Sequence, residues 1–188
     1  MIQFKLKAPY FLFLLLCINA FSQPKEKVVL VAQRVADLVT VKVPETFQKL
    51  SDDQIADKII ASRKPLSMYS SPNGSSDFSV SVGNSARNPW EDKDLKMMAD
   101  FQKANINALF TSVTWLEDKI LKVNGQQFAV FEFVSEVKEK GKPAIKKYNN
   151  VRYTIKKKNV LIFSFVCPEV EKPLQQELAE DILNSIKF

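Results

Sequence analysis

The sequence contains no histidine, and its 188 residues include only four glycines and two cysteines. Without histidine the chain can form neither a Ser-His-Asp nor a Cys-His catalytic arrangement, and it has no histidine ligand for a metal. The few glycines form no Gly-rich phosphate-binding loop of the dinucleotide-binding or P-loop kind. We therefore expect a protein that is not an enzyme and that has no cofactor, no metal site and no catalytic residues.

The rest of the composition is typical of a globular protein, with 46% hydrophobic and 26% charged residues and a net charge of +6. A chain of this length suits a single domain with a core of its own. No internal repeat and no long linker interrupts it. We expect residues 23–188 to form this one domain.

Residues 1–22 have the three parts of a secretory signal peptide. A basic start is followed by an apolar run over 10–18, and the small residues Ala20 and Ser22 precede a cleavage site before Gln23. This apolar run is too short to span a bilayer, which takes ~20 residues. The pattern predicts an exported protein, periplasmic or extracellular, that keeps no membrane span.

The two cysteines differ in their expected fates. Cys17 lies within the signal peptide, and lipid attachment there is an alternative, although Leu16 stands where such signals have a small residue. Cleavage would leave Cys167 alone, so the mature chain would have no intramolecular disulfide. Because Cys167 ends an apolar stretch, we favour a small buried side chain over a reactive thiol.

Hydrophobic periodicity predicts an α+β fold. Alternating or apolar runs predict strands over 39–43, 66–69, 78–82, 113–123, 128–137, 145–157 and 160–167. Capping patterns predict helices that begin after Ser51, near Asn88 and after Pro173, the last with Leu174, Leu178, Ile182 and Ile186 on one face. The run over 160–167 is apolar at successive positions, which indicates a central strand buried on both faces.

The order of these elements resembles that of PsbP-like domains. The resemblance rests on the strand that ends in Pro44-Glu45, the helix introduced by Asn88-Pro89-Trp90, the segment Val123 to Val130, and the closing strand and helix. It covers about residues 37–188. It implies an α/β/α sandwich, with a mostly antiparallel central sheet and helices on both faces, that serves binding rather than catalysis. It implies no particular functional residues.

The segment 138–158 carries nine lysines and arginines against one acid, Glu139. Such a cluster attracts an anionic partner in a salt-dependent way, or it forms a solvated hairpin whose lysines deter edge-to-edge pairing. Export disfavours nucleic acid and favours an anionic protein or envelope surface. Alternation along two strands predicts an outward, partner-binding set: Lys140, Lys142, Lys147, Tyr153 and Lys157.

Three polar residues fall at apolar positions and are candidates for a pocket. Glu132 lies between Val130 and Val134 on one face of a strand, and Arg152 on the next strand is its expected partner. Gln102 falls on the apolar face of the middle helix. The alternatives are a structural ion pair and a packing-edge amide.

These observations predict a non-enzymatic binding or assembly module of the bacterial cell envelope that contacts a partner protein. A carrier of a small apolar ligand or lipid is the alternative, since the 14 phenylalanines would suit either a core or a pocket.

Overall fold

A computed structural model describes residues 28–59, 64–83, 90–138, 141 and 143–188. The expected signal peptide and two expected binding residues, Lys140 and Lys142, lie outside the described residues. The strands are β1 (Leu30–Val35), β2 (Val39–Pro44), β3 (Gln48–Lys49), β4 (Ser67–Ser70), β5 (Asp77–Val82), β6 (Ser112–Val123), β7 (Gln126–Val137), β8 (Ile145–Lys156) and β9 (Asn159–Pro168). The helices are α1 (Asp52–Lys58), α2 (Leu95–Leu109) and α3 (Lys172–Asn184).

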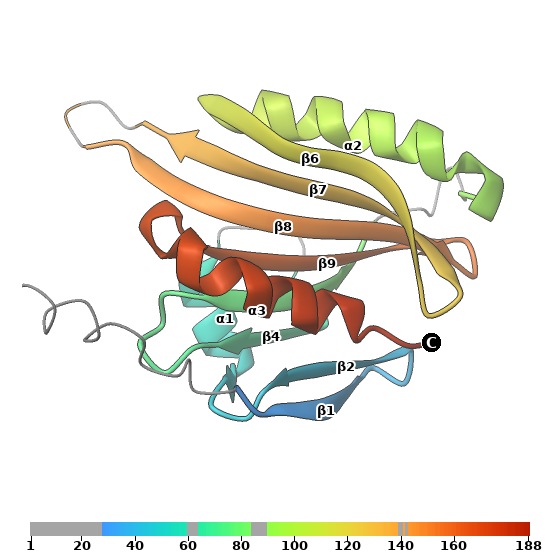
Figure 1. Cartoon of the computed structure of the whole chain (residues 1–188), viewed down its shortest axis with the longest axis horizontal. Helices are drawn as coiled ribbons and strands as arrows, with labels where there is room; N and C mark the ends of the chain where they lie inside the picture. Colours follow the sequence, from blue (N-terminus) through green and yellow to red (C-terminus); the bar gives the residue numbers. More distant parts are fainter. Residues whose placement is uncertain (1–27, 60–63, 84–89, 139–140, 142) are drawn as a thin grey trace, which may run out of the picture.

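The described strands form a seven-stranded antiparallel sheet in the order β3-β4-β5-β9-β8-β7-β6, and β1 and β2 form a separate hairpin (Figure 1). Alternate residues of the sheet belong to different cores. One core joins α3 and β2 to Phe163 and Phe165, and the other joins α2 to Phe131 and Tyr153. Helices therefore cover both faces of the sheet, and the predicted α+β sandwich is confirmed.

The central strand β9 lies between β5 and β8, as the sequence predicted. Its two faces differ in exposure, however. Leu161, Phe163 and Phe165 are buried beneath α3, whereas Ile162 and Ser164 on the other face are half-buried. The prediction of burial on both faces was therefore wrong for part of this strand, because α2 packs over β6, β7 and β8 and leaves β9 at the margin of its cover.

Local signals place most element ends correctly. Ser51 caps α1 in a capping box with Gln54, as its spacing predicts. A 3-10 turn over Asp92–Asp94 leads into α2, and it is this turn that is capped, by the Glu91 backbone N–H that donates to Asp94 Oδ2 at 3.0 Å. Asn88, which the sequence suggested as the cap, lies outside the described residues.

The sequence analysis missed β1. Its turn to β2 runs from Ala36 to Leu38. Ala36 and Asp37 have φ of 47° and 54°, and they lack the Asn-Gly signature of such turns. Within the described ranges, no helix is both long and apolar enough to cross a membrane.

Candidate ligand-binding site at one end of the sheet

Glu132 and Arg152 are brought together beneath α3, in a polar cluster that we call the α3 cluster. It consists of Glu132, Asn150, Arg152, Gln176, Glu180 and Asn184. The three strand residues share one face, where Glu132 lies opposite Asn150 and Arg152 lies opposite Val130. The expected pairing of Glu132 with Arg152 was wrong, because the Arg152 guanidinium instead contacts α3.

Helix α3 supplies the partners from positions four residues apart, which lie on one side of a helix. The Arg152 Nη2 donates to Glu180 Oε2 at 2.7 Å, and its Nη1 donates to Asn184 Oδ1 at 2.9 Å. The Gln176 amide donates to Glu132 Oε1 at 2.7 Å. The expected apolar stripe begins later than its spacing suggested, since Leu174 is 69% exposed.

Burial raises the pKa of Glu132 above its usual 4.5, and the carboxylates of Glu180 and Glu117 raise it further. Glu117 lies directly opposite Glu132 on β6. The Lys172 ammonium opposes this rise. Burial also lowers the pKa of Arg152, while Glu180 holds it up. The two charged strand residues thus depend on α3 for their compensation.

Replacing Glu132 with glutamine should stabilise the protein increasingly as the pH rises. A carboxyl with a raised pKa binds its proton more tightly in the folded state, so stability falls as the pH rises from the unfolded value near 4.5 through the folded pKa. The Glu132→Gln variant has no carboxyl to ionise, so it does not lose this stability, and its amide oxygen can still accept from Gln176. Thermal melts of both proteins from pH 4 to pH 8 measure the difference, and a gap in melting temperature that is constant across the range would contradict the assignment.

The strand residues of the α3 cluster are closed to a partner. Glu132 is 5% exposed and Arg152 is fully buried. Gln102 does not join them, because α2 packs on the opposite face of the sheet. The three pocket candidates therefore do not form one pocket, and the cluster's direct effect is to fix α3 on the sheet.

Of the predicted outward set, Lys147 and Lys157 are exposed as expected, whereas the prediction for Tyr153 was wrong. Tyr153 is 7% exposed and packs edge-on against Phe131, with ring centroids 5.6 Å apart. Burial raises its pKa to about 12. Lys147 and Lys157 are exposed but lie at opposite ends of β8, about 33 Å apart at strand rise. Because both faces of β8 are covered here, its cations project only from its ends.

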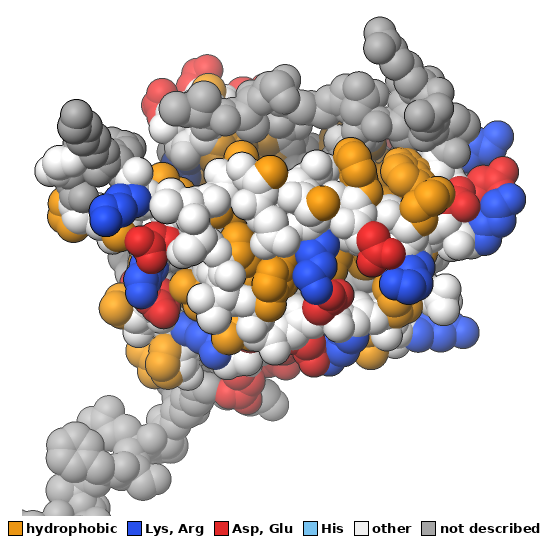
Figure 2. All heavy atoms as spheres, turned by 90° about the horizontal axis from the view of Figure 1, so that it is seen from above, with side chains coloured by type: hydrophobic (Ala, Val, Ile, Leu, Met, Phe, Trp, Pro, Cys, Tyr) orange, Lys and Arg blue, Asp and Glu red, His pale blue; other side chains and the backbone are white. Residues whose placement is uncertain are grey.

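On the side formed by α2 and β6, the described residues present apolar and charged side chains together. Figure 2 shows hydrophobic side chains there interspersed with lysines and acids. Lys96 pairs with Asp100, and Lys103 pairs with Asp118. Features that suit a ligand gather instead at one end of the sheet.

We call this region the turn end: in the described part of the chain, three tight hairpin turns meet there beside Phe188 (Figure 1, right). The turns are Ala36 to Leu38, Asn124-Gly125 and Lys157-Lys158, and all of their residues except Leu38 have positive φ. This conformation matches the twist of a tight hairpin, but it favours Asn and Gly. Lys157 and Lys158 adopt it at φ of 49° and 65°.

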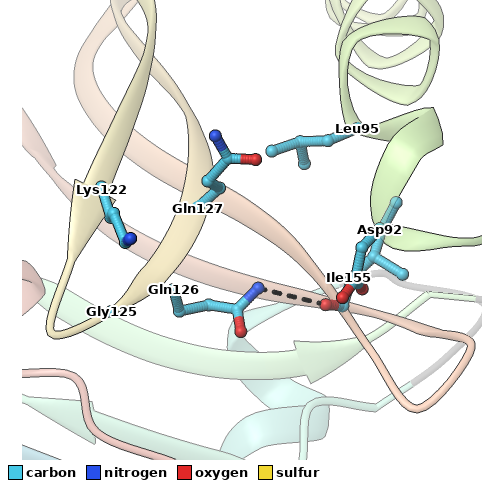
Figure 3. A pocket seen from close by; sticks show the side chains of 7 residues that line it. All are labelled: Asp92, Leu95, Lys122, Gly125, Gln126, Gln127 and Ile155. Carbon is cyan, nitrogen blue, oxygen red and sulfur yellow. Dashed lines mark hydrogen bonds between the residues drawn. The ribbon is translucent and has the colours of Figure 1, made fainter.

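A polar cavity of about 270 Å³ lies between the β6–β7 turn and the start of α2 (Figure 3). Asp92 and Lys122 line it together with Gln127, whose amide points toward Leu95. Gln126 is already engaged, since its Nε2 donates to Thr154 Oγ1 at 2.9 Å. This cavity is shallow and lined mostly by polar groups.

An apolar cavity of about 330 Å³ lies beside the β8–β9 turn. Leu38, Val82, Leu161 and Phe188 provide its apolar wall. Lys156, Lys157, Asp37 and Asn159 complete the lining. The sequence analysis included Lys157 but missed the others, although one signal was visible: three successive lysines between two apolar strands.

The remaining chemistry-bearing residue of the core is Cys167. It is 1% exposed, and burial raises the pKa of its thiol to about 12, so it stays protonated and unreactive at neutral pH. The expected buried cysteine is thus confirmed. Among the described residues, no group of three acidic or cysteine side chains is placed to hold a metal ion.

No protein-family model and no curated protein matches the chain. Solved structures do match it in fold. Cyanobacterial PsbP (CyanoP) from Synechocystis is 10% identical, with a TM-score of 0.54 over 88% of this chain and 96% of that one. The Ran-binding protein Mog1p of Saccharomyces cerevisiae is 11% identical, with a TM-score of 0.52 over 86% and 96% of the two chains. The protein therefore has the PsbP-like fold that its sequence resembles.

Proposed function

We propose that this protein is an exported, non-enzymatic binding module of the bacterial cell envelope, and that it contacts an anionic partner protein through the β8–β9 turn. The export step rests on the signal-peptide pattern of residues 1–22. The absence of histidine and the enclosure of Glu132, Arg152 and Cys167 in the core support a role without catalysis.

The observation that carries the proposal is the conformation of Lys157 and Lys158. Both lysines occupy left-handed positions that Asn or Gly would occupy at lower cost. Both are exposed, and among the described residues neither has an acidic partner. Strain kept at an exposed, uncompensated charge is typical of a site maintained for binding.

The fold supports a binding role by analogy. Mog1p, which shares the fold, is a Ran-binding protein. A shared fold does not by itself identify the binding partner. The β8–β9 turn adds a surface on this chain that prefers an anionic partner.

Replacing Lys157 with asparagine and Lys158 with glycine should stabilise the protein and weaken its partner contact. The Asn-Gly pair relieves two left-handed side chains, which we expect to raise the free energy of unfolding by about 1–2 kcal/mol and the melting temperature by about 2–8 °C. The same change removes two cations, so salt-dependent capture of proteins from the native envelope fraction should fall.

The matched control is Lys146→Gln with Lys147→Gln, which removes two cations at the other end of β8. Lys146 lies 4.0 Å from Glu169, so part of the charge at that end is already compensated. Capture should be unchanged in this control. Loss of capture in the control alone would move the contact to the other end of β8, and equal capture by all three proteins would contradict the proposal.

A further inference from the structure

We propose that the apolar cavity beside the β8–β9 turn binds a small amphipathic anion, specifically a medium-chain fatty carboxylate. This site goes beyond the protein contact proposed above, because it concerns a small ligand and is tested on the purified protein alone. Three features carry it: an apolar wall, a fixed cation at its rim, and a compensated acid.

The wall has the shape and composition of a ligand pocket. Its volume of about 330 Å³ lies at the lower end of the range for small-ligand sites. Leu161 forms a buried base, whereas Leu38 and Phe188 are 44% and 43% exposed. These two exposed apolar side chains gain cover only if something apolar occupies the cavity.

Phe188 is a rigid part of this wall. Its ring stacks on Phe128 with centroids 6.3 Å apart and meets Phe163 edge-on at 6.4 Å. Both partners are fully buried. The core thus holds the ring in place, so the apolar surface exists before a ligand arrives and binding orders few side chains.

Lys156 places a positive charge at the rim. Its Nζ lies 5.0 Å from the centroid of the Phe188 ring and 3.3 Å from Gln126 Oε1. An ammonium has three N–H donors, so this contact to Gln126 leaves donors for a ligand oxygen. Lys157 also lines the cavity and adds a second cation.

The acid in the lining does not cancel these charges. Asp37 pairs with Arg34, whose Nε lies 2.9 Å from Asp37 Oδ1. The side chains that line the cavity thus include two lysines against one acid that already has an ion-pair partner, above an apolar floor. A ligand that matches both parts has an alkyl chain and one anionic head group.

The polar cavity on the other side of the turn end lacks this combination. Its lining contains one acid and one cation, Asp92 and Lys122, and two glutamines. An alkyl chain would gain little there. The preference for an amphipathic anion therefore belongs to the apolar cavity.

Isothermal titration of the purified protein with octanoate, below its micelle concentration, tests the proposal. The probes 1-octanol and octyltrimethylammonium have the same chain without the charge or with the opposite charge, and inorganic phosphate has charge without a chain. We expect binding of octanoate and at least tenfold weaker binding of the other three probes.

Two variants locate the site. Lys156→Gln with Lys157→Gln should weaken octanoate binding about tenfold, whereas Lys146→Gln with Lys147→Gln should leave it unchanged. Leu38→Glu places an anion at the exposed mouth of the cavity and should abolish binding without changing the melting temperature appreciably. Amide chemical shifts in the wild type should move at Val82 and Leu161.

Several results would overturn the proposal. Equal binding of 1-octanol would remove the role of the charge, and competition by phosphate would reduce the site to a general anion site. Octanoate binding that survives in Leu38→Glu would place the ligand elsewhere. If octanoate does not bind but Leu38→Glu loses protein capture, the cavity belongs to the protein contact instead.

Discussion

Replacing Phe163 with alanine should lower the free energy of unfolding by about 3–5 kcal/mol, the range for removing a large aromatic side chain from a core. Phe163 is fully buried at the centre of β9, where it lies opposite Val80 of β5 and Arg152 of β8. Its ring meets Phe128 edge-on, with centroids 6.0 Å apart. The melting temperature should fall by about 2–4 °C for each kcal/mol lost.

The neighbouring residue provides the control. Ile162 points to the half-covered face of the same strand, so Ile162→Ala should cost clearly less than Phe163→Ala. Chemical denaturation of both variants measures the two free energies. Equal losses would mean that both faces of β9 are equally covered, as the sequence alone predicted, and a loss below about 1 kcal/mol for Phe163→Ala would exclude a central position.

This contrast shows how far the sequence predicts the fold. Alternation and turn residues are local signals, and they correctly placed the hairpin at Asn124-Gly125 and the strands on either side of it. How much of a face is covered depends on where a helix lies across several strands. Nothing within 160–167 encodes the position of α2, so the exposure of Ile162 could not be predicted.

The candidate site was harder to predict for the same reason. The sequence identified Glu132 as unusual, but its partner Gln176 lies 44 residues away on α3. The apolar cavity combines residues from as far apart as Leu38 and Phe188. Lysine density alone indicated a binding surface, whereas β8 divides those lysines between its two ends because both its faces are covered.

The second large effect concerns the ion pair of Arg152 with Glu180. Replacing Glu180 with leucine should lower the free energy of unfolding by about 3 kcal/mol, the lower end of the range for breaking a buried pair. The side chain of Arg152 is fully buried and that of Glu180 is 35% exposed. Removing Glu180 would therefore leave a buried cation without its anionic partner. The Arg152 guanidinium would keep its hydrogen bond to Asn184 but lose Glu180, its ion-pair partner among the described residues.

Replacing both residues of the ion pair distinguishes the effect of an unpaired buried charge from that of a general loss of packing. Arg152→Met with Glu180→Leu removes the two charges together, so no cation is left buried without compensation and apolar contacts replace the pair. We expect this double variant to recover most of the stability that Glu180→Leu loses, with a coupling energy above about 1 kcal/mol in a double-mutant cycle. Additive losses would mean that the pair contributes as two independent packing groups. Recovery would identify compensation of Arg152 as the interaction that holds α3 on the sheet, and octanoate binding at the turn end should then be unchanged in the double variant.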